Sequence, residues 1–206
     1  MKNQIKKAIE TYNKYAKIYA DRTFNVILQF QQTEFISLLP GKKILDIGSG
    51  SGRDSKHFKD EGLEVIGIDI SDGLLEEAKK RAPGVEFKKM DMLNMDFKEN
   101  AFDGIWLAAT LSDIEKKDAA KFLEDCKKVL KNKGIIYISV KEGEGEKVEK
   151  KEYLGNEERF YSYYNKKELV DLLESVGFKV LKSRKTDDLE NTWIEIFAKK
   201  ANLSLD

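Results

Sequence analysis

The chain has 206 residues, enough for one compact domain with a substantial core that needs neither disulfides nor metals. Its 37 basic and 37 acidic side chains give a formal net charge of zero, so no overall electrostatic attraction favours nucleic acid or an anionic membrane as a partner. A single histidine and a single cysteine exclude an internal disulfide and a zinc cluster.

The chain starts Met-Lys-Asn-Gln-Ile-Lys-Lys, without the apolar region of a secretory signal, and no stretch is long and apolar enough to span a membrane, so we expect a cytoplasmic protein.

The first forty residues predict two helices. A second helix should run from about residue 25 to residue 39, where Pro40 and Gly41 end it. The two helices either cap the carboxyl ends of the following strands or pack on the sheet, and we expect Tyr12 and Tyr19 near any ligand. Seven apolar and aromatic residues form a stripe along one face of the first helix: Ile5, Ala8, Ile9, Tyr12, Tyr15, Ala16 and Tyr19.

From residue 42 onward, predicted strands and helices alternate, which is typical of a mainly parallel sheet with helices on both faces. The link 185–192 is too short for a crossover helix, so the last two strands should form an antiparallel hairpin in a seven-stranded sheet. We expect strands at 43–47, 64–69, 85–89, 102–108, 134–140, 178–184 and 193–199, and helices near 53–61, 73–82, 115–130 and 166–176.

The first predicted strand runs into the glycine-rich segment 48–52, and the second ends in Asp69. Glycines let the backbone approach a ligand closely, and such an acid can accept hydrogen bonds from two ribose hydroxyls. The dinucleotide pattern G-x-G-x-x-G is not met, because Arg53 replaces its third glycine, and Asp46 would repel a phosphate but favour an ammonium or sulfonium group. S-adenosylmethionine carries both cations and no phosphate, which makes it the favoured ligand. A nicotinamide or flavin dinucleotide and a tight turn without a ligand are the alternatives.

Two potentially reactive side chains are expected to have structural roles. Cys126 falls on the apolar face of the helix 115–130 and should belong to the core. His57 follows the glycines by about one helical turn and has no identifiable orienting partner, so we expect it to be structural or exposed to solvent.

The link 141–165 is unusually long. Its first half mixes glycines with charges, which predicts a solvated mobile loop, whereas its aromatic second half needs a surface to pack against. A lid over a substrate site would satisfy both halves.

In the order and spacing of several short motifs, the chain resembles the class I S-adenosylmethionine-dependent methyltransferases, specifically the small type with an N-terminal helical cap. The resemblance implies an α/β, Rossmann-like fold: a seven-stranded, mostly parallel sheet with an antiparallel last strand and helices on both faces. We expect one domain over 1–206, with a cap at 1–40, a nucleotide-binding core at 41–200 and the lid as an insertion at 141–165. The motifs are Ile-Leu-Asp-Ile-Gly-Ser-Gly-Ser-Gly-Arg-Asp (44–54), Gly-Ile-Asp-Ile-Ser (67–71), Lys-Met-Asp-Met (89–92), Phe-Asp-Gly-Ile-Trp (102–106), Leu-Lys-Asn-Lys-Gly-Ile-Ile-Tyr-Ile-Ser (130–139) and Leu-Leu-Glu-Ser-Val-Gly-Phe (172–178).

Carried over by position, the resemblance implies how the ribose and the methionine of the cofactor are held. The backbone of Gly48 and Gly50 would line both groups. Asp69 would bind the ribose hydroxyls, and Ile70 would lie against one face of the adenine.

The resemblance assigns five further residues to the two ends of the cofactor. Asp91 would accept a hydrogen bond from the adenine amine, and Met92 would offer its backbone N–H and its thioether. The carbonyl of Leu107 would face the methionine ammonium, while Tyr19 and Arg22 would close on the methionine carboxylate.

The segment after the fourth strand departs from the family pattern. Many relatives have a histidine there, whereas this sequence reads Ala-Ala-Thr-Leu-Ser-Asp over 108–113. Asp113 either replaces that histidine as a base or substrate anchor or caps the helix that follows, and the cap is the favoured interpretation.

The implied reaction is methyl transfer by in-line displacement, which leaves S-adenosylhomocysteine and obliges no dedicated acid or base. With only two prolines, the chain lacks the Pro-Pro motif common in methyltransferases of exocyclic base amines, so a small-molecule acceptor between the cap and the aromatic segment 153–164 is favoured. Protein or tRNA acceptors remain open. The alternatives are a non-catalytic adenosylmethionine-binding module, aminopropyl transfer on the same fold, and a nicotinamide-dependent oxidoreductase.

Overall fold

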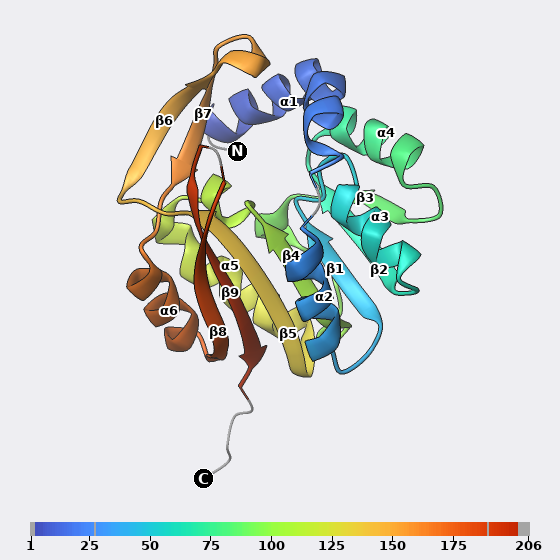
Figure 1. The fold of residues 1–206 in the computed structure, drawn as a ribbon, viewed down its shortest axis with the longest axis vertical. Coiled ribbons are helices and arrows are strands. Elements are labelled where there is room, and N and C mark those ends of the chain that lie inside the picture. Colours follow the sequence, from blue (N-terminus) through green and yellow to red (C-terminus); the bar gives the residue numbers. More distant parts are fainter. Residues whose placement is uncertain (1–2, 27, 189, 202–206) are drawn as a thin grey trace.

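The computed structural model describes residues 3–26, 28–188 and 190–201. Its centre is a seven-stranded sheet with the strand order β3-β2-β1-β4-β5-β9-β8, as Figure 1 shows. The first five of these strands are parallel to one another, and β9 runs antiparallel to both β5 and β8. The expected sheet with one reversed strand is therefore confirmed. The strands are β1 (Lys43–Ile47), β2 (Glu64–Asp69), β3 (Glu86–Lys89), β4 (Phe102–Ala108), β5 (Leu130–Lys141), β8 (Phe178–Asp187) and β9 (Thr192–Lys200).

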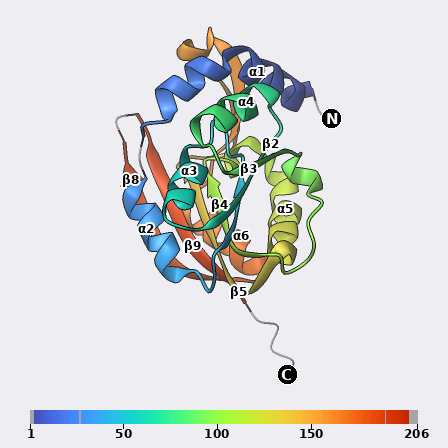
Figure 2. The same cartoon turned by 90° about the vertical axis from the view of Figure 1, so that its right-hand side faces the viewer.

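Helices cover both faces of the sheet because alternate strand residues point to opposite sides and both sets are apolar. On β4, Trp106 faces an aromatic cluster with Phe35 and Phe58, whereas Ile105 and Leu107 face the larger aliphatic core. The Trp106 indole has ring centroids of Phe35 and Phe58 at 5.2 and 5.0 Å. The predicted helices are observed as α2 (Gln29–Leu38), α3 (Arg53–Asp60), α4 (Asp72–Arg81), α5 (Lys116–Val129) and α6 (Lys166–Ser175), and Figure 2 shows how they flank the sheet.

The segment 141–165 contains a second, two-stranded sheet, so the expectation of a solvated mobile loop in its first half is wrong. Strand β6 (Glu146–Lys151) pairs antiparallel with β7 (Glu157–Ser162). Opposite charges lie directly across the ladder, because Lys150 pairs with Glu158 and Lys151 with Glu157, and such cross-strand pairs stabilise a sheet. The expectation for the aromatic half is confirmed, since Tyr164 is buried in the main core.

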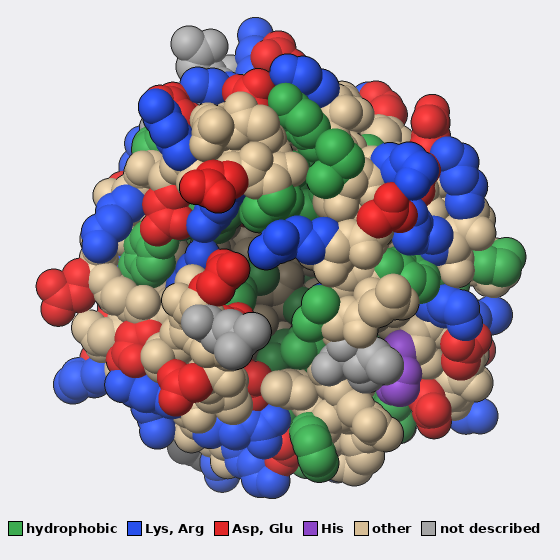
Figure 3. All heavy atoms as spheres, turned by 45° about the horizontal axis from the view of Figure 1, so that its top comes forward, with side chains coloured by type: hydrophobic (Ala, Val, Ile, Leu, Met, Phe, Trp, Pro, Cys, Tyr) green, Lys and Arg blue, Asp and Glu red, His purple; other side chains and the backbone are tan. Residues whose placement is uncertain are grey.

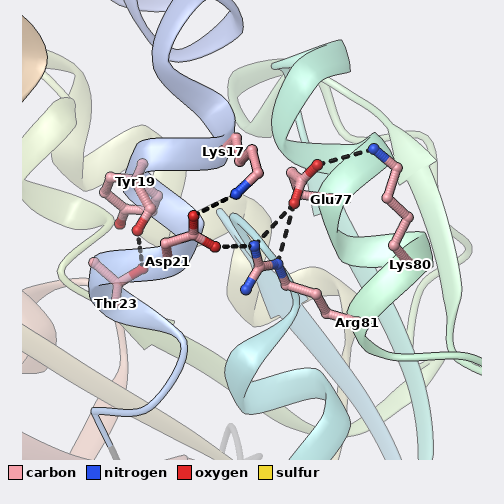
Figure 4. A network of polar contacts seen from close by, with 7 residues as sticks. All are labelled: Lys17, Tyr19, Asp21, Thr23, Glu77, Lys80 and Arg81. Atoms are coloured by element: carbon pink, nitrogen blue, oxygen red, sulfur yellow. Dashed lines mark hydrogen bonds and ion pairs between the residues drawn. The ribbon is translucent and has the colours of Figure 1, made fainter.

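Helix α1 (Asn3–Thr23) spans the gap between this hairpin and α4, above the carboxyl ends of the parallel strands (Figure 1). On the side of α4, Arg81 donates hydrogen bonds to Asp21 on α1 and to Glu77 on α4 (Figure 4). On the side of the hairpin, Lys7 Nζ lies 2.8 Å from Glu158 Oε2. The first helix is therefore a bridge across the top of the sheet as well as a packing element.

Ser71 ties α1 to the start of α4. Its Oγ accepts a hydrogen bond from the backbone N of Leu74 at 3.2 Å and donates one to Asn13 Oδ1 at 2.8 Å, while its side chain is fully buried. The hydroxyl is thus both the cap of α4 and an anchor for α1.

We predict that Ser71→Ala lowers the free energy of unfolding by about 1–2 kcal/mol, because a cap and a buried hydrogen bond are lost together. Urea denaturation measures this change. The control is Ser175→Ala, whose exposed hydroxyl only donates to the Leu172 carbonyl, and it should stay within about 0.5 kcal/mol of wild type. Equal effects of the two substitutions would contradict the assigned role of Ser71.

Candidate functional site

A cavity of about 960 Å³ opens at the carboxyl ends of β1, β2 and β4, beneath α1 and the β6–β7 hairpin. Figure 3, which brings the top of Figure 1 toward the reader, shows a hollow near the centre of this face with hydrophobic, basic and acidic side chains around it. Strands β1 and β4 are neighbours, although β2 and β3 follow β1 in the chain, so the strand order reverses here, as at the ligand crevices of open α/β sheets. Pockets for small molecules and cofactors reach this size.

The floor of the cavity includes the glycine turn after β1. Gly48 and Gly50 have φ values of +69° and +53°, in the left-handed region that glycine tolerates best, and both line the cavity. A Cβ added to Gly50 would lie 3.7 Å from the ring of Tyr19 and would otherwise project into open space. At Gly48 an added Cβ would collide with the Thr110 side chain at 2.6 Å.

Asp69 ends β2 beside this turn. Its Oδ2 accepts a hydrogen bond from the Gly50 backbone N and its Oδ1 accepts one from the Ser71 backbone N, both at 2.9 Å. Burial raises the pKa of the carboxyl, and the two N–H donors oppose that rise. Asp69 and the following Ile70 are half-buried and line the cavity.

Asp91 and Met92 line the same cavity where β3 ends. Asp91 begins a short 3₁₀ helix (Met92–Asn94), since its Oδ1 accepts from the Leu93 backbone N and its Oδ2 from the Asn94 side chain, both at 2.9 Å. The turn therefore fixes the carboxylate of Asp91 at the cavity wall.

Helix α1 contributes Tyr19 and Arg22 to the roof. The Tyr19 ring lies edge-to-face with Tyr12 at 5.2 Å between centroids, and Thr23 donates to the Tyr19 carbonyl in the last turn of α1 (Figure 4). The Arg22 guanidinium stacks 4.7 Å from the centroid of Tyr153, which lies between the strands of the hairpin. Tyr12 also lines the cavity, as expected for the two tyrosines singled out in the helical stripe.

The side chain of Leu107 is fully buried in the aliphatic core, which does not test the role expected of its backbone carbonyl, and the residues that follow it, Ala108, Ala109 and Thr110, line the cavity. Asp46 lies outside the lining, so the expectation that its carboxylate faces a ligand is not met. Its Oδ2 accepts a hydrogen bond of 2.5 Å from Ser55 on α3.

Arg53 also lines the cavity. From the sequence we had used this residue only to argue against a dinucleotide ligand. Its Nε and Nη2 donate to the two carboxylate oxygens of Asp54 at 2.9 and 2.7 Å. Asp54 is buried and also accepts from Gln32 Nε2 and Trp106 Nε1. A buried carboxylate therefore orients the Arg53 guanidinium at the cavity wall.

Asp113 is not the cap of α5, because Glu115 occupies the N-cap position. Asp113 lines the cavity and accepts a 2.7 Å hydrogen bond from Nη2 of Arg159 on β7. Burial raises the pKa of Asp113, and the charge of Arg159 opposes the rise. No local pattern connects two residues that are 46 positions apart, so this pair could not be found from the sequence.

Cys126 and His57 lie where the sequence analysis expected them. Cys126 is fully buried in the core, and burial raises the pKa of its thiol. His57 is half-buried beside Phe58 on α3 and is not a lining residue of the cavity. Across the described residues, no cluster of His, Cys, Asp and Glu is arranged to hold a metal ion. None of the helices in the described ranges combines the length and apolar character needed to cross a membrane.

Comparison with known proteins gives one family match. Residues 44–134 match the family described as a methyltransferase domain. The chain is 30% identical over 168 residues to the phosphoethanolamine N-methyltransferase of Plasmodium falciparum. The aligned segment covers 78% of this chain and 62% of that protein. The chain spans about half the length of the curated relatives that it matches.

Two solved structures share the fold. An S-adenosylmethionine-dependent methyltransferase of Methanosarcina mazei superposes with a TM-score of 0.73 and 23% identity, covering 82% of this chain and 97% of the other. The 1,6-didemethyltoxoflavin-N1-methyltransferase of Burkholderia thailandensis, solved with 1,6-didemethyltoxoflavin and S-adenosylhomocysteine, gives a TM-score of 0.71 and 20% identity, with coverages of 95% and 88%.

Because Asp46 is a buried acid, the free energy of unfolding should depend on pH through its titration. Burial, reinforced by the nearby Asp54, raises the pKa of Asp46 to about 7, against an ordinary value of 3.8. Between these values the folded chain keeps a proton that the unfolded chain has lost, so the stability that this proton supplies is lost as the pH rises through about 7.

We predict that Asp46→Asn gains stability relative to wild type as the pH rises from 5 to 8, by on the order of 2 kcal/mol, because asparagine has no such proton to lose. Urea denaturation of both proteins at the two pH values measures the change. Asp60→Asn, at the exposed end of α3, should show no such trend. A stability difference between Asp46→Asn and wild type that is independent of pH would contradict the prediction.

Proposed function

Because the chain belongs to the class I S-adenosylmethionine-dependent methyltransferase family, we propose that it binds S-adenosylmethionine in the cavity and transfers the methyl group to a small-molecule acceptor. The observation that carries the proposal is the carboxylate of Asp69, held by the N–H groups of Gly50 and Ser71 at a cavity wall next to a glycine turn. A carboxylate in this position can accept hydrogen bonds from two vicinal hydroxyls of a ribose.

The residues at the glycine turn fit an adenosyl cofactor. Gly50 leaves open the space that any side chain would fill, and its left-handed backbone brings the turn close to the cavity. The hydrogen bonds from Gly50 and Ser71 occupy one site on each oxygen of Asp69, and each carboxylate oxygen can accept another. The ribose would be held there, with Gly48 and Gly50 lining the methionine side.

The adenine would lie toward β3. Ile70 and Met92 supply apolar surface for its two faces, and the polarizable thioether of Met92 suits contact with a ring. The two hydrogen bonds that Asp91 accepts within its own turn fix its carboxylate, which keeps capacity for the exocyclic amine.

The methionine carboxylate would lie beneath α1, near Tyr19, Arg22 and Arg53. These three residues line the cavity, and Arg53 is oriented by its two hydrogen bonds to Asp54. A guanidinium suits a carboxylate because both are planar and charge-assisted hydrogen bonds between them are strong. The carbonyl of Leu107 would face the methionine ammonium beside the segment 108–110, which lines the cavity.

When bound, the cofactor would supply a methyl group on a sulfonium: the lone pair of the acceptor would form a bond to that carbon as the carbon–sulfur bond breaks, and S-adenosylhomocysteine would leave as the thioether. The task of the chain is to align the acceptor and to exclude water. Helix α1 and the β6–β7 hairpin cover the cavity, and the carboxylate of Asp113 lies at the exit of β4, where it can orient an acceptor or take up its proton.

The dinucleotide alternative conflicts with the charges around α3. A pyrophosphate would need the N-terminus of this helix, but the buried carboxylate of Asp54 lies within its first turn. A non-catalytic adenosylmethionine-binding module fits the same geometry and differs only in turnover. A coupled assay of S-adenosylhomocysteine release over a panel of small amines, phenols and phosphobases separates the two: release supports the enzyme, and binding without release on any acceptor favours the module.

We predict that Asp69→Asn weakens binding of S-adenosylmethionine and S-adenosylhomocysteine about 10- to 100-fold, because charged hydrogen bonds to the ribose are lost. Isothermal titration calorimetry measures this. Asp72→Asn, an exposed acid three residues later that pairs with Lys89, is the matched control and should bind as wild type does. Unchanged affinity in Asp69→Asn would contradict the ribose assignment.

We also predict that Gly50→Ala abolishes cofactor binding while the protein stays folded, because the added methyl group enters the cavity without a close protein contact. Gly62→Ala is the control, since Gly62 also has a positive φ and no atom would lie within 4 Å of its Cβ. Both variants should lose similar stability in thermal melts, about 1 kcal/mol, and only Gly50→Ala should lose affinity. Normal affinity in Gly50→Ala would place the cofactor elsewhere.

A further inference from the structure

The end of the cavity opposite the adenosine position is lined by cations. Lys141 ends β5, Lys151 ends β6 and Arg159 lies on β7, and all three residues line the cavity. In the sheet order, β5 is separated from β2 and its Asp69 by β1 and β4. This end therefore lies beyond the proposed cofactor, where an acceptor would enter.

The three cations surround one aromatic ring. The Nζ atoms of Lys141 and Lys151 lie 4.9 and 5.0 Å from the centroid of Tyr161, and the guanidinium carbon of Arg159 lies 5.4 Å from it. Their side chains are poorly hydrated, with exposures of 13%, 19% and 2%. Like charges this close and this dry are unfavourable unless counter-charge is present, because desolvation strengthens their repulsion.

Protein carboxylates neutralise only part of this charge. Glu149 lies 2.7 Å from Lys151 and 4.0 Å from Lys141, and Asp113 pairs with Arg159, so two carboxylates face three cations. The other acids that line this side of the cavity have different surroundings. Glu152 and Glu190 are exposed, so water screens the charge of Glu190 that acts on Lys141, and Glu115 and Asp118 begin α5, where the helix dipole favours acids.

Arg159 itself has unused hydrogen-bonding capacity. Nη2 donates to Asp113, while Nε is buried and has no hydrogen-bond acceptor among the described residues. The guanidinium carbon lies over the ring of Tyr12, 4.1 Å from its centroid, and both residues line the cavity. A buried donor without a partner costs free energy, and an anion is the natural group to satisfy it.

We propose that the methyl acceptor carries an anionic group, a phosphate or a carboxylate, that binds among Lys141, Lys151 and Arg159 beside Tyr161. This inference rests on the proposed methyltransferase function and specifies the chemical class of its acceptor. With the anion held at the hairpin and the cofactor on the glycine turn, the reacting atom of the acceptor lies between them, over the end of β4 and Asp113.

Three probes with one phenyl ring test the proposal: phenyl phosphate, benzoate and benzamide, which is the neutral isostere of benzoate. Each is titrated calorimetrically into the protein, with and without saturating S-adenosylhomocysteine. We expect both anions, or one of them, to bind at least tenfold more tightly than benzamide, and the stronger of the two identifies the anionic group as phosphate or carboxylate. Equal affinity for benzamide and the anions, or no binding of either anion, would overturn the proposal.

Variants locate the binding site. Lys141→Gln and Lys151→Gln should each weaken anion binding about 10- to 100-fold through loss of a charge-assisted contact, without changing the affinity for S-adenosylhomocysteine. Lys147→Gln is the matched control, because Lys147 is exposed on the same strand, does not line the cavity and lies over Tyr163 instead of Tyr161. Anion binding that is equally weakened in Lys147→Gln, or unaffected in the other two variants, would overturn the assigned site. Failure of S-adenosylhomocysteine to bind would instead count against the proposed function, and the titrations without it still report on the anion site.

Discussion

The pair of hydrogen bonds from the backbone N–H groups of Gly50 and Ser71 to the carboxylate of Asp69 is the constraint on which the site depends. It joins the turn after β1 to the start of α4 through the end of β2, so three segments that diverge from the sheet are held at one point. Glycine suits residue 50 because the backbone is left-handed there and a side chain would project into the cavity. The cavity exists because this junction lies where the strand order reverses.

The rest of the molecule covers that junction. Helix α1 is tied to α4 through Asp21 and Arg81 and to the hairpin through Lys7 and Glu158. Its aromatic face is thereby turned toward the cavity, where Tyr12 stacks with Arg159. Exposed ion pairs of this kind contribute little individually, about 0–1 kcal/mol, so this cover is held mainly by packing and by the partly buried hydrogen bond from Ser71 to Asn13.

Much of the fold followed from the sequence, because buried parallel strands are continuous apolar runs and the glycine and proline positions mark their ends. The bounds of β1, β2 and β4 were predicted to the residue. Predictions from local sequence patterns were wrong where pairing between distant segments determines the structure. The charged sequence of β6 predicted a loop, but its residues pair with β7 in a sheet. Asp113 was predicted to be a helix cap, but it pairs with Arg159, which is 46 residues away. The charge of Asp46 was used to argue for a cationic ligand because the sequence does not show that its carboxylate accepts a hydrogen bond from Ser55 on α3 and lies outside the cavity lining.

The cofactor position is the central claim, and a crystal structure of the protein with S-adenosylhomocysteine tests it most directly. The account predicts that both ribose hydroxyls lie within hydrogen-bond distance of the Asp69 carboxylate, with the adenine near Met92 and the methionine beneath α1. A ribose bound away from Asp69, or an adenosine seated against the hairpin cations at Arg159, would contradict it.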